Sequence, residues 1–545
     1  MADRAAGDPG AALGRAGGAP AAAAAAPGGP ALSAHILLRI EAGRVVERLE
    51  SDSPADLARL ARGEGHVAWY DRRLEPWLRE PAAWPELLRH PLEVLHLGAL
   101  ERTDLAVGDL GRVDFDSPFL MPGPGDRHPS WLVGPAAGIA SAALVRALGI
   151  GPGPGLARAI LEFGRRAHRE GLFLYAEPAL LGGRVPDEVS RALRFELARR
   201  DLAVLIARGY GRRWLAFWAL AAALFDRSLP LGAALAGWRA PAPPDTDRDS
   251  LARLHPQVDP GIASEEEVDA VIPTLGRPGP LRDLLADLAA QTVPPRRVIV
   301  VDQRPPGAGL PPPADLGADW PFELVSRTVD WIGACRARNL ALGEVRSPWV
   351  LFLDDDVRLP ADTVARLAAT ARAYGVGAVN AAVYLPRQEA ETGTDALPRV
   401  WSTFGTCVAL VETAALRQAG PFDERLEGGY GEDAEIGIRL RRAGCNVLYA
   451  PAIRVLHLKA PMGGFRYDFP FPWRDEVPPP QPSPIFLYAR NKHATPSMRQ
   501  GYRLFYLLNR LRSAPALAWP AELFRALRRW RRSAHWAERL SEGAS

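Results

Sequence analysis

Apolar and polar residues follow a strand-then-helix rhythm through the second half of the chain. An apolar stretch at 268–274 is followed by four leucines at helical spacing between 281 and 288, and then by a second apolar stretch at 298–301. Short apolar runs that alternate with a 3.6-residue periodicity are typical of strands connected by helices. This order predicts a β-α-β unit whose two strands are parallel.

The same rhythm continues with a predicted helix at 332–342, a strand at 349–353 and a helix that begins near Pro360. Three polar residues stand where the predicted strands end: Thr274, Asp302 and Asp354. Ligands of open α/β sheets bind at the carboxyl ends of the strands, so these residues are expected to share one site.

Proline-rich polar stretches divide the chain into segments. The prediction has five parts: a disordered Ala/Gly-rich N-terminus (1–34), an α/β domain (35–238), a linker (239–266), a second α/β domain (267–474), and a Pro-rich linker with a basic helical tail (475–545). A chain of 545 residues agrees with this division, because a single core rarely serves more than about 300 residues.

Composition narrows the class of protein. Hydrophobic residues make up 48% of the chain and charged residues 24%, which is typical of globular proteins and excludes wholesale disorder. A net charge of +3 and the lack of an RNA- or DNA-binding motif argue against a nucleic-acid partner. The apolar run at 214–225 is shorter than the roughly 20 residues that span a bilayer, so no transmembrane segment is expected.

The three cysteines, Cys335, Cys407 and Cys445, are widely spaced and odd in number. They offer neither a disulfide framework nor a paired-cysteine metal site. A reducing, cytoplasmic setting fits this usage best.

Three consecutive aspartates, Asp354, Asp355 and Asp356, follow directly after the apolar run at 351–353. Adjacent carboxylates repel one another, and a hard divalent cation that also holds a phosphate is the partner best suited to oxygen ligands. A solvated acidic turn is the alternative interpretation. Groups that could contact a nucleotide and its phosphates lie upstream: Pro273, Thr274 and Arg277 in a strand-to-loop turn, Asp302 after the second strand, and Arg336, Arg338 and Asn339 on a helix.

Downstream, a glycine turn at 428–431 leads into a predicted helix that begins with Glu432 and Asp433. Acidic residues at a helix N-terminus are often capping residues, but the glycines before them allow a substrate to approach closely. The helix is expected to bury Ile436, Leu440 and Ala443 and to turn Arg439, Arg441 and Arg442 outward. His457 ends a further strand and is a candidate metal ligand.

In this order the motifs resemble those of an inverting family 2 glycosyltransferase with a GT-A fold, over residues 268 to about 473. The turn at 273–277, Asp302, the Gly-x-x-x-Ala-Arg-Asn segment at 333–339, the acidic triplet and the Glu432-Asp433 pair match the family in order and spacing. Each motif alone is weak, and five together on an α/β pattern are a strong signal.

The resemblance implies a nucleotide-diphosphate sugar held with Mn²⁺ or Mg²⁺. Asp354 would contact the nucleoside or the metal, while Asp356 and His457 would bind the metal. Asp433 would act as the general base on an acceptor hydroxyl, in a saccharide or a lipid-linked acceptor. A single displacement would then invert the anomeric configuration.

The first half contains a weaker version of the same pattern. Residues 66–73 resemble 349–356 with arginines in place of the last two aspartates, and 138–144 and 171–176 resemble 406–416 and 444–450. No acidic pair corresponds to Glu432-Asp433, and too little chain precedes residue 66 for a nucleotide-binding half. These features predict a degenerate GT-A-like domain that would bind acceptor, shape a dimer or brace the active domain. Chance similarity between two α/β domains is the alternative.

Residues 499–532 carry nine arginines against one acid, Glu522. Leu523, Leu527 and Trp530 share one helical face, which could lie on an anionic membrane at its inner surface or pack against the catalytic domain.

Two other classes of protein compete with the glycosyltransferase. A haloacid-dehalogenase-type phosphohydrolase also has an Asp-x-Asp motif after a strand, but its lysine should precede the last acidic motif. Here both lysines, Lys459 and Lys492, follow Glu432-Asp433. A non-catalytic sugar-binding protein would need neither the acidic triplet nor the Glu-Asp pair, and it describes the first half better than the whole chain.

Overall fold

The computed structural model describes residues 35–98, 110–118, 126–151, 155–193, 197–259, 266–312, 316–317, 319–386, 397–460 and 469–543. Residues 1–34, which were predicted to be a disordered N-terminus, lie outside the described residues.

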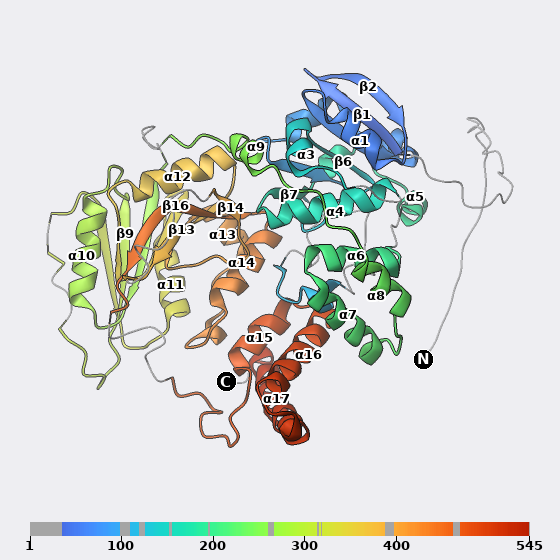
Figure 1. Cartoon of the computed structure of the whole chain (residues 1–545). Helices are drawn as coiled ribbons and strands as arrows, with labels where there is room; N and C mark the ends of the chain where they lie inside the picture. The colour runs from blue at the N-terminus through green and yellow to red at the C-terminus, as the bar shows by residue number, and fades with distance from the viewer. Residues whose placement is uncertain are drawn as a thin grey trace, which may run out of the picture. The chain divides into compact units, whose positions relative to one another are not determined.

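A nine-stranded mixed sheet forms the second half of the fold (Figure 1). Its strands are β8 (Val268–Thr274), β9 (Arg297–Gln303), β10 (Glu323–Val329), β11 (Trp349–Leu353), β12 (Val357–Arg358), β13 (Ala378–Tyr384), β14 (Arg399–Val400), β15 (Val408–Glu412) and β16 (Val447–His457). β10, β9, β8 and β11 are parallel neighbours, which confirms the predicted β-α-β unit. β15 is antiparallel to both β11 and β13, so the sheet is mixed.

Helices cover both faces of this sheet because successive strand residues point to opposite sides. Ile272 and Leu351 join the core beneath α10 (Pro278–Ala289) and α12 (Thr363–Tyr374). Their sequence neighbours Val271 and Phe352 join the core beneath the helices of the other face. Those helices are α11 (Ala334–Leu342), α13 (Thr413–Ala419) and α14 (Glu432–Arg442).

A seven-stranded sheet forms the first half of the fold, in the order β2-β1-β3-β6-β4-β7-β5. Its strands are β1 (His35–Glu41), β2 (Arg44–Glu50), β3 (His66–Asp71), β4 (Glu93–His96), β5 (His128–Pro129), β6 (Ala137–Ser141) and β7 (Phe173–Ala176). Its helices are α1 (Pro54–Leu60), α3 (Ala142–Leu148), α4 (Leu156–Arg169), α5 (Asp187–Ala192), α6 (Arg199–Gly209), α7 (Arg212–Phe225) and α8 (Leu231–Trp238). The predicted α/β class therefore holds for both halves.

Five strands of the first sheet are paired as five strands of the second sheet are. β3, β6, β4 and β7 lie side by side, with two antiparallel pairs followed by one parallel pair. β11, β15, β13 and β16 have the same order and the same directions. β5 and β14 each add an antiparallel partner, to β7 and β16 respectively. This five-strand part of the second sheet thus recurs in the first, in agreement with the three matching segments.

Local contacts recur at equivalent positions as well. The Asp71 amide donates to the Ala136 carbonyl at 2.7 Å, and the Asp354 amide donates to the Cys407 carbonyl at 2.9 Å. On the helix before the last strand of each copy, a Cβ at Gly164 would lie 2.7 Å from the Val133 nitrogen, and one at Gly437 would lie 2.9 Å from the Phe404 nitrogen. Only glycine allows a helix to approach the backbone so closely.

The first copy lacks the chemistry of the second. An antiparallel hairpin, β1 and β2, borders β3 where the parallel strands β8 and β9 border β11. Asp71, which corresponds to Asp354, is bound by Arg73 at 2.7 Å. Counting from the equivalent glycines, Ile160 stands where Asp433 stands in the second copy. This half retains a GT-A-like topology without an acidic site.

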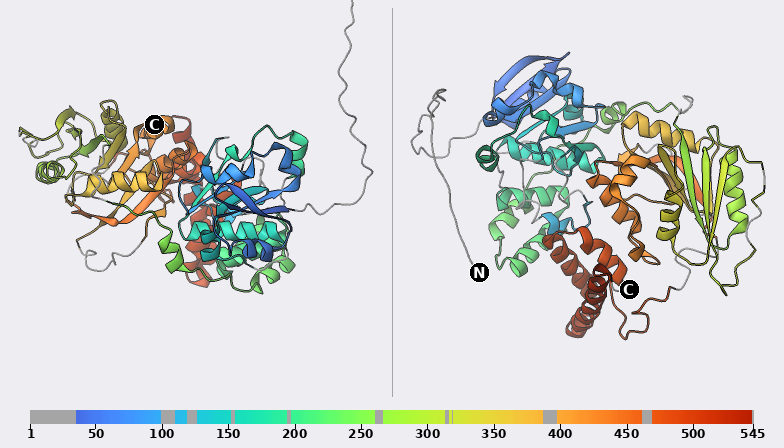
Figure 2. Two further views of the ribbon diagram at one scale, coloured as in Figure 1. Left: turned by 90° about the horizontal axis from the view of Figure 1, so that it is seen from above. Right: turned by 180° about the vertical axis from the view of Figure 1, so that it is seen from behind.

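The two remaining segments pack onto the fold. The segment predicted as a linker contains α9 (Arg248–Arg253), whose Leu251 is buried. The tail forms three helices, α15 (Pro484–His493), α16 (Pro496–Arg512) and α17 (Trp519–Ser541). Both views of Figure 2 show these red helices beside the orange elements of the second half. In the described part of the chain, no helix is both long enough and apolar enough to cross a membrane.

Candidate active site

The carboxyl ends of β8, β9 and β11 open into a cavity of about 410 Å³. Most of the predicted site residues line it: Pro273, Thr274, Arg277, Arg338, Asp354, Asp355, Asp356, Glu432, Asp433 and His457. The predicted residues in this lining run from Pro273 to His457, so residues up to 184 positions apart are gathered at one edge of the sheet.

Asp355 is held inside the wall of the cavity. Its Oδ2 accepts the Thr274 hydroxyl at 2.7 Å and its Oδ1 accepts Arg277 Nη1 at 2.6 Å. Burial raises the pKa of Asp355 to about 6, although the Arg277 charge and the two hydrogen bonds oppose that rise. With both oxygens bound, Asp355 fixes the β8 turn and the Arg277 guanidinium, and this arrangement gives it a positioning role.

Asp356 points toward His457. The imidazole Nε2 lies 3.1 Å from Asp356 Oδ1, and Asp356 Oδ2 accepts the Ala460 amide at 2.8 Å. Burial would raise the pKa of Asp356, but the contacts with His457, Arg277 and the Ala460 amide outweigh burial and lower it. Asp356 is therefore ionised at neutral pH, as a metal ligand must be.

The donor set fits a divalent metal. One ligand atom each from Asp354, Cys407 and His457 lie within 4.8 Å of one another, and Asp356 contacts the same histidine. Carboxylate donors suit Mg²⁺ and Mn²⁺, and imidazole and thiolate donors suit Zn²⁺. Cys407 was not predicted as part of this cluster.

Glu432 and Asp433 begin α14 and face the cavity. Asp433 Oδ1 accepts the Thr406 hydroxyl at 2.8 Å and the Thr406 amide at 3.2 Å. Burial raises the pKa of Asp433, and burial together with the neighbouring Asp433 charge raises the pKa of Glu432 to about 7. Two carboxyls with raised pKa values at a cavity wall are suited to acid-base chemistry near neutral pH.

Arg338 supplies a buried cation between the two acidic groups. Its side chain is 6% exposed, and Nη2 lies 3.5 Å from Asp354 Oδ1. Within the described residues, its Nε and Nη1 have no hydrogen-bond partner. A buried guanidinium with unused donors at a cavity wall can bind an anionic ligand group.

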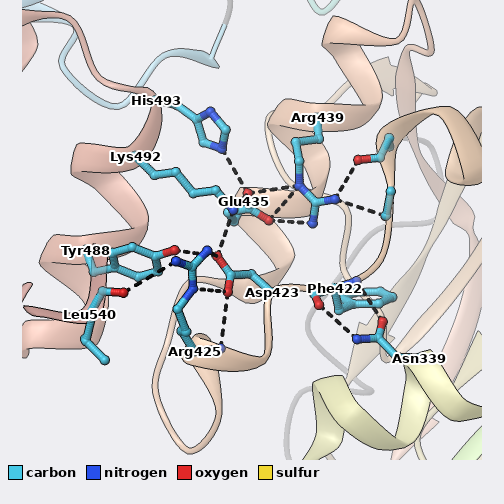
Figure 3. Close-up of polar contacts among 12 residues, drawn as sticks. Asn339, Phe422, Asp423, Arg425, Glu435, Arg439, Tyr488, Lys492, His493 and Leu540 are labelled. Atoms are coloured by element: carbon cyan, nitrogen blue, oxygen red, sulfur yellow. Dashed lines mark hydrogen bonds and ion pairs between the residues drawn. The ribbon is translucent and has the colours of Figure 1, made fainter. Parts of the chain in front are cut away.

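Two residues that were predicted to contact the nucleotide sugar, Asn339 and Asp302, do not line the described cavity. Asn339 lies outside the cavity lining and exchanges hydrogen bonds with the Phe422 backbone, donating to its oxygen at 2.9 Å and accepting from its nitrogen at 2.8 Å (Figure 3). Its amide is thus used to hold a loop. Asp302 is likewise absent from the described lining and is paired with Arg304 at 2.6 Å.

The expectation that Arg441 faces outward is wrong. Arg441 is 3% exposed and donates to the Ser402 and Gly437 carbonyls. Burial lowers its pKa to about 9. The cavity residues that were not predicted as site residues include Gln303, Thr406 and Cys407. The last two precede β15, and an antiparallel pairing of β15 with β11 would have placed them opposite Asp354.

Comparison with known proteins agrees with the motifs. Residues 269–408 match the family model described as Glycosyl transferase family 2. Over 199 residues, or 34% of this chain, the sequence is 29% identical to the succinoglycan biosynthesis protein ExoM of Rhizobium meliloti (strain 1021). The chain spans 64% of the length of that relative.

Two solved structures give distant likenesses. S. aureus TarS 1-349 in complex with UDP-GlcNAc is 15% identical, with a TM-score of 0.32 over 45% of this chain and 72% of that chain. GalNAc-T7 with UDP, GalNAc and Mn²⁺ is 12% identical, with a TM-score of 0.34 over 46% of this chain and 52% of that chain. Likenesses this distant carry no argument about ligands or activity.

The second half of the chain has a fold of the GT-A class. Its mixed sheet has helices on both faces, and the acidic ends of its strands share one cavity. The match of residues 269–408 to the glycosyl transferase family 2 model agrees with the resemblance that the motifs of the second half indicated.

Proposed function

We propose that this protein is a metal-dependent inverting glycosyltransferase that moves a sugar from a nucleotide-diphosphate donor to an acceptor hydroxyl. One observation carries the proposal: the acidic strand end, the buried Arg338 and the Asp433 carboxyl share a single cavity. The match of residues 269–408 to the family 2 model supports the same reaction.

The β8 turn and Arg338 form the donor side of the proposed site. Arg338 offers two unused nitrogens to the diphosphate, and Thr274 and Arg277 are fixed by Asp355 beside it. Asp354 and Asp356, with His457, would hold Mn²⁺ or Mg²⁺, and Cys407 is within reach of the same position. When bound, the metal supplies positive charge for the leaving diphosphate.

Asp433 is the proposed general base. Its carboxylate, oriented by Thr406, takes the proton of the acceptor hydroxyl as that oxygen attacks the anomeric carbon. Attack from the face opposite the diphosphate inverts the anomeric configuration. Glu432 sets the protonation of the pair, because two neighbouring carboxylates disfavour each other's ionised form.

A donor screen tests the proposal. We expect one or a few nucleotide sugars to release nucleoside diphosphate in the presence of Mn²⁺, and we expect EDTA to abolish release until Mn²⁺ is added back. The anomeric configuration of the product, read by NMR, tests inversion. No release from any donor with a panel of saccharide and lipid-linked acceptors would argue for the sugar-binding alternative.

The acceptor class is proposed from the relative ExoM, whose name assigns it to succinoglycan biosynthesis. A growing saccharide, free or lipid-linked, is the acceptor that follows by analogy. The family 2 match leaves no support for the phosphohydrolase alternative.

The tail is the proposed contact with an anionic membrane, at the cytoplasmic face. Trp530 of α17 packs on Tyr502 and Tyr506, so that part of the predicted face is used inside the fold. Leu517, just before α17, and Phe524, in its second turn, are 100% and 69% exposed and are close in sequence to the arginines of α17. Exposed apolar residues flanked by arginines suit an anionic interface.

Vesicle sedimentation tests this contact. Binding to phosphatidylglycerol vesicles is expected to exceed binding to phosphatidylcholine vesicles and to fall with added salt. Phe524→Asp should weaken it, whereas Val477→Asp, at a residue that is 82% exposed in another segment, should not. Equal binding by both variants would exclude the tail as the contact.

A further inference from the structure

One face of α15 packs against the segment that carries the proposed base Asp433. Five residues at helical spacing form this face: Ile485, Tyr488, Ala489, Lys492 and His493. Each of them contacts residues between Asp423 and Glu435. The segment 423–435 includes one wall of the cavity, from Leu426 to Asp433.

The apolar part of this face packs against the glycine turn. A Cβ at Gly429 would lie 2.3 Å from Ile485 Cγ2, and a Cβ at Gly431 would lie 3.0 Å from Ala489 Cβ. Gly431 also has a φ of 129°, which L side chains rarely adopt. The glycines therefore let α15 approach the turn immediately before Glu432.

The polar part of this face binds both ends of the segment (Figure 3). Lys492 Nζ lies 2.8 Å from Asp423 Oδ2 and 2.7 Å from Glu435 Oε1. Tyr488 donates to Asp423 at 2.6 Å, and His493 Nε2 lies 2.9 Å from Glu435 Oε1. Among the described residues, Lys492 is the one side chain that contacts both carboxylates.

These carboxylates remain charged despite their burial. The side chains of Glu435 and Asp423 are 1% and 7% exposed. Burial would raise both pKa values, but hydrogen bonds from His493 and Arg439 lower that of Glu435 to about 2, and those from Arg425, Lys492 and Tyr488 lower that of Asp423. The ammonium of Lys492 is therefore held between two anions.

We propose that Lys492 is a positioning residue that links the two ends of segment 423–435 and so fixes the base Asp433 and the acceptor side of the cavity. This role rests on the proposed function. It also makes the tail helix α15 part of the active site, although α15 contributes no residue to the described lining.

Removing the ammonium should leave the fold intact. In Lys492→Met, Glu435 keeps Arg439 and His493, and Asp423 keeps Arg425 and Tyr488. Each carboxylate stays paired, and what is lost is the link between them. A base that shifts by even about 1 Å can lose 10²-fold in rate, so we expect kcat to fall by about 10- to 100-fold while donor affinity stays unchanged.

The experiment compares Lys492→Met, Lys492→Arg and Arg510→Met in the full-length protein. Arg510 pairs with Glu522 at 2.6 Å within the tail and does not touch α14, so its loss tests tail stability alone. Expected results are a lower kcat and faster amide exchange over 426–433 in Lys492→Met, recovery of both in Lys492→Arg, and neither change in Arg510→Met.

Two results would overturn the proposal. One is unchanged kcat and exchange in Lys492→Met. The other is an equal loss of kcat in Arg510→Met, which would mean that any weakening of the tail is enough. Amide exchange needs no substrate. It therefore tests whether Lys492 links the two ends of segment 423–435 even if no sugar donor supports transfer and the proposed function fails.

Discussion

Asp433→Asn is expected to lower kcat by about 10²- to 10⁴-fold, the usual contribution of a general base, while donor binding is retained. The amide keeps the shape of the side chain and can still accept the Thr406 hydroxyl, which donates at 2.8 Å in the wild type. It cannot take the acceptor proton. Single-turnover kinetics and titration with the matching nucleoside diphosphate separate the two effects.

The pH dependence of kcat provides a second view of the same base. Burial raises the pKa of both carboxyls, so the rate should fall on the acid side with a limb above the ordinary pKa of an aspartate. In Glu432→Gln one negative charge next to the base is gone, and the limb should move to lower pH. If the base is a residue elsewhere in the cavity, Glu432→Gln should leave the pH of the acid limb unchanged.

Thermal stability distinguishes a loss of catalytic activity from a loss of folded structure. A carboxyl whose pKa is raised by folding stabilises the protein fully below its ordinary pKa near 4, and this contribution is lost as pH rises through the folded-state value, about 7 for Glu432. At pH 8 the ionised pair is therefore unfavourable for folding. Asp433→Asn should melt at the same or a higher temperature than wild type. A lower melting temperature together with lost donor binding would mean that Asp433 is structural.

Local patterns were enough to predict the parallel part of the second sheet. The strands at 268–274 and 349–353 begin and end where the pattern placed them, because buried strands leave continuous apolar runs bounded by polar residues. Glu432 begins α14 as predicted, since glycines and an acidic first turn are strong start signals.

Contacts between segments far apart in the sequence could not be predicted from local patterns. Thr406 and Cys407 reach the site because β15 runs antiparallel to β11, and neither residue stands out in its own neighbourhood. Arg441 looks like a surface residue by helical spacing, yet it caps backbone carbonyls of a distant loop. Asn339 belongs to a family motif, but its amide holds the Phe422 backbone. Each of these contacts depends on tertiary structure.

The weak repeat shows how topology outlasts sequence. Few identities connect residues 66–73 with 349–356, and yet β3 is antiparallel to β6 just as β11 is antiparallel to β15. Glycines at close approaches are the positions that agree, Gly164 with Gly437 and Gly171 with Gly444. Backbone geometry constrains such positions whether or not a half carries the acidic residues.

Asp356→Ala is expected to abolish binding of Mn²⁺ with nucleoside diphosphate. Even residues that only orient metal ligands contribute about 10- to 100-fold to affinity, so loss of a ligand should cost more. Asp356→Asn should bind as poorly, although it can keep the hydrogen bond from the Ala460 amide, because the lost element is negative charge. Titration calorimetry and the electron paramagnetic resonance spectrum of free Mn²⁺ measure the binding directly.

The matched control is Asp283→Asn, which removes a carboxylate whose side chain is 57% exposed and lies outside the described cavity lining. It should bind Mn²⁺ and nucleoside diphosphate as the wild type does. If Asp356→Asn also binds them normally, then Asp354, Cys407 and His457 are sufficient for the metal. Asp356 would then serve to anchor Arg277, 3.1 Å from its Oδ2, and the acidic triplet would act on the donor through that guanidinium.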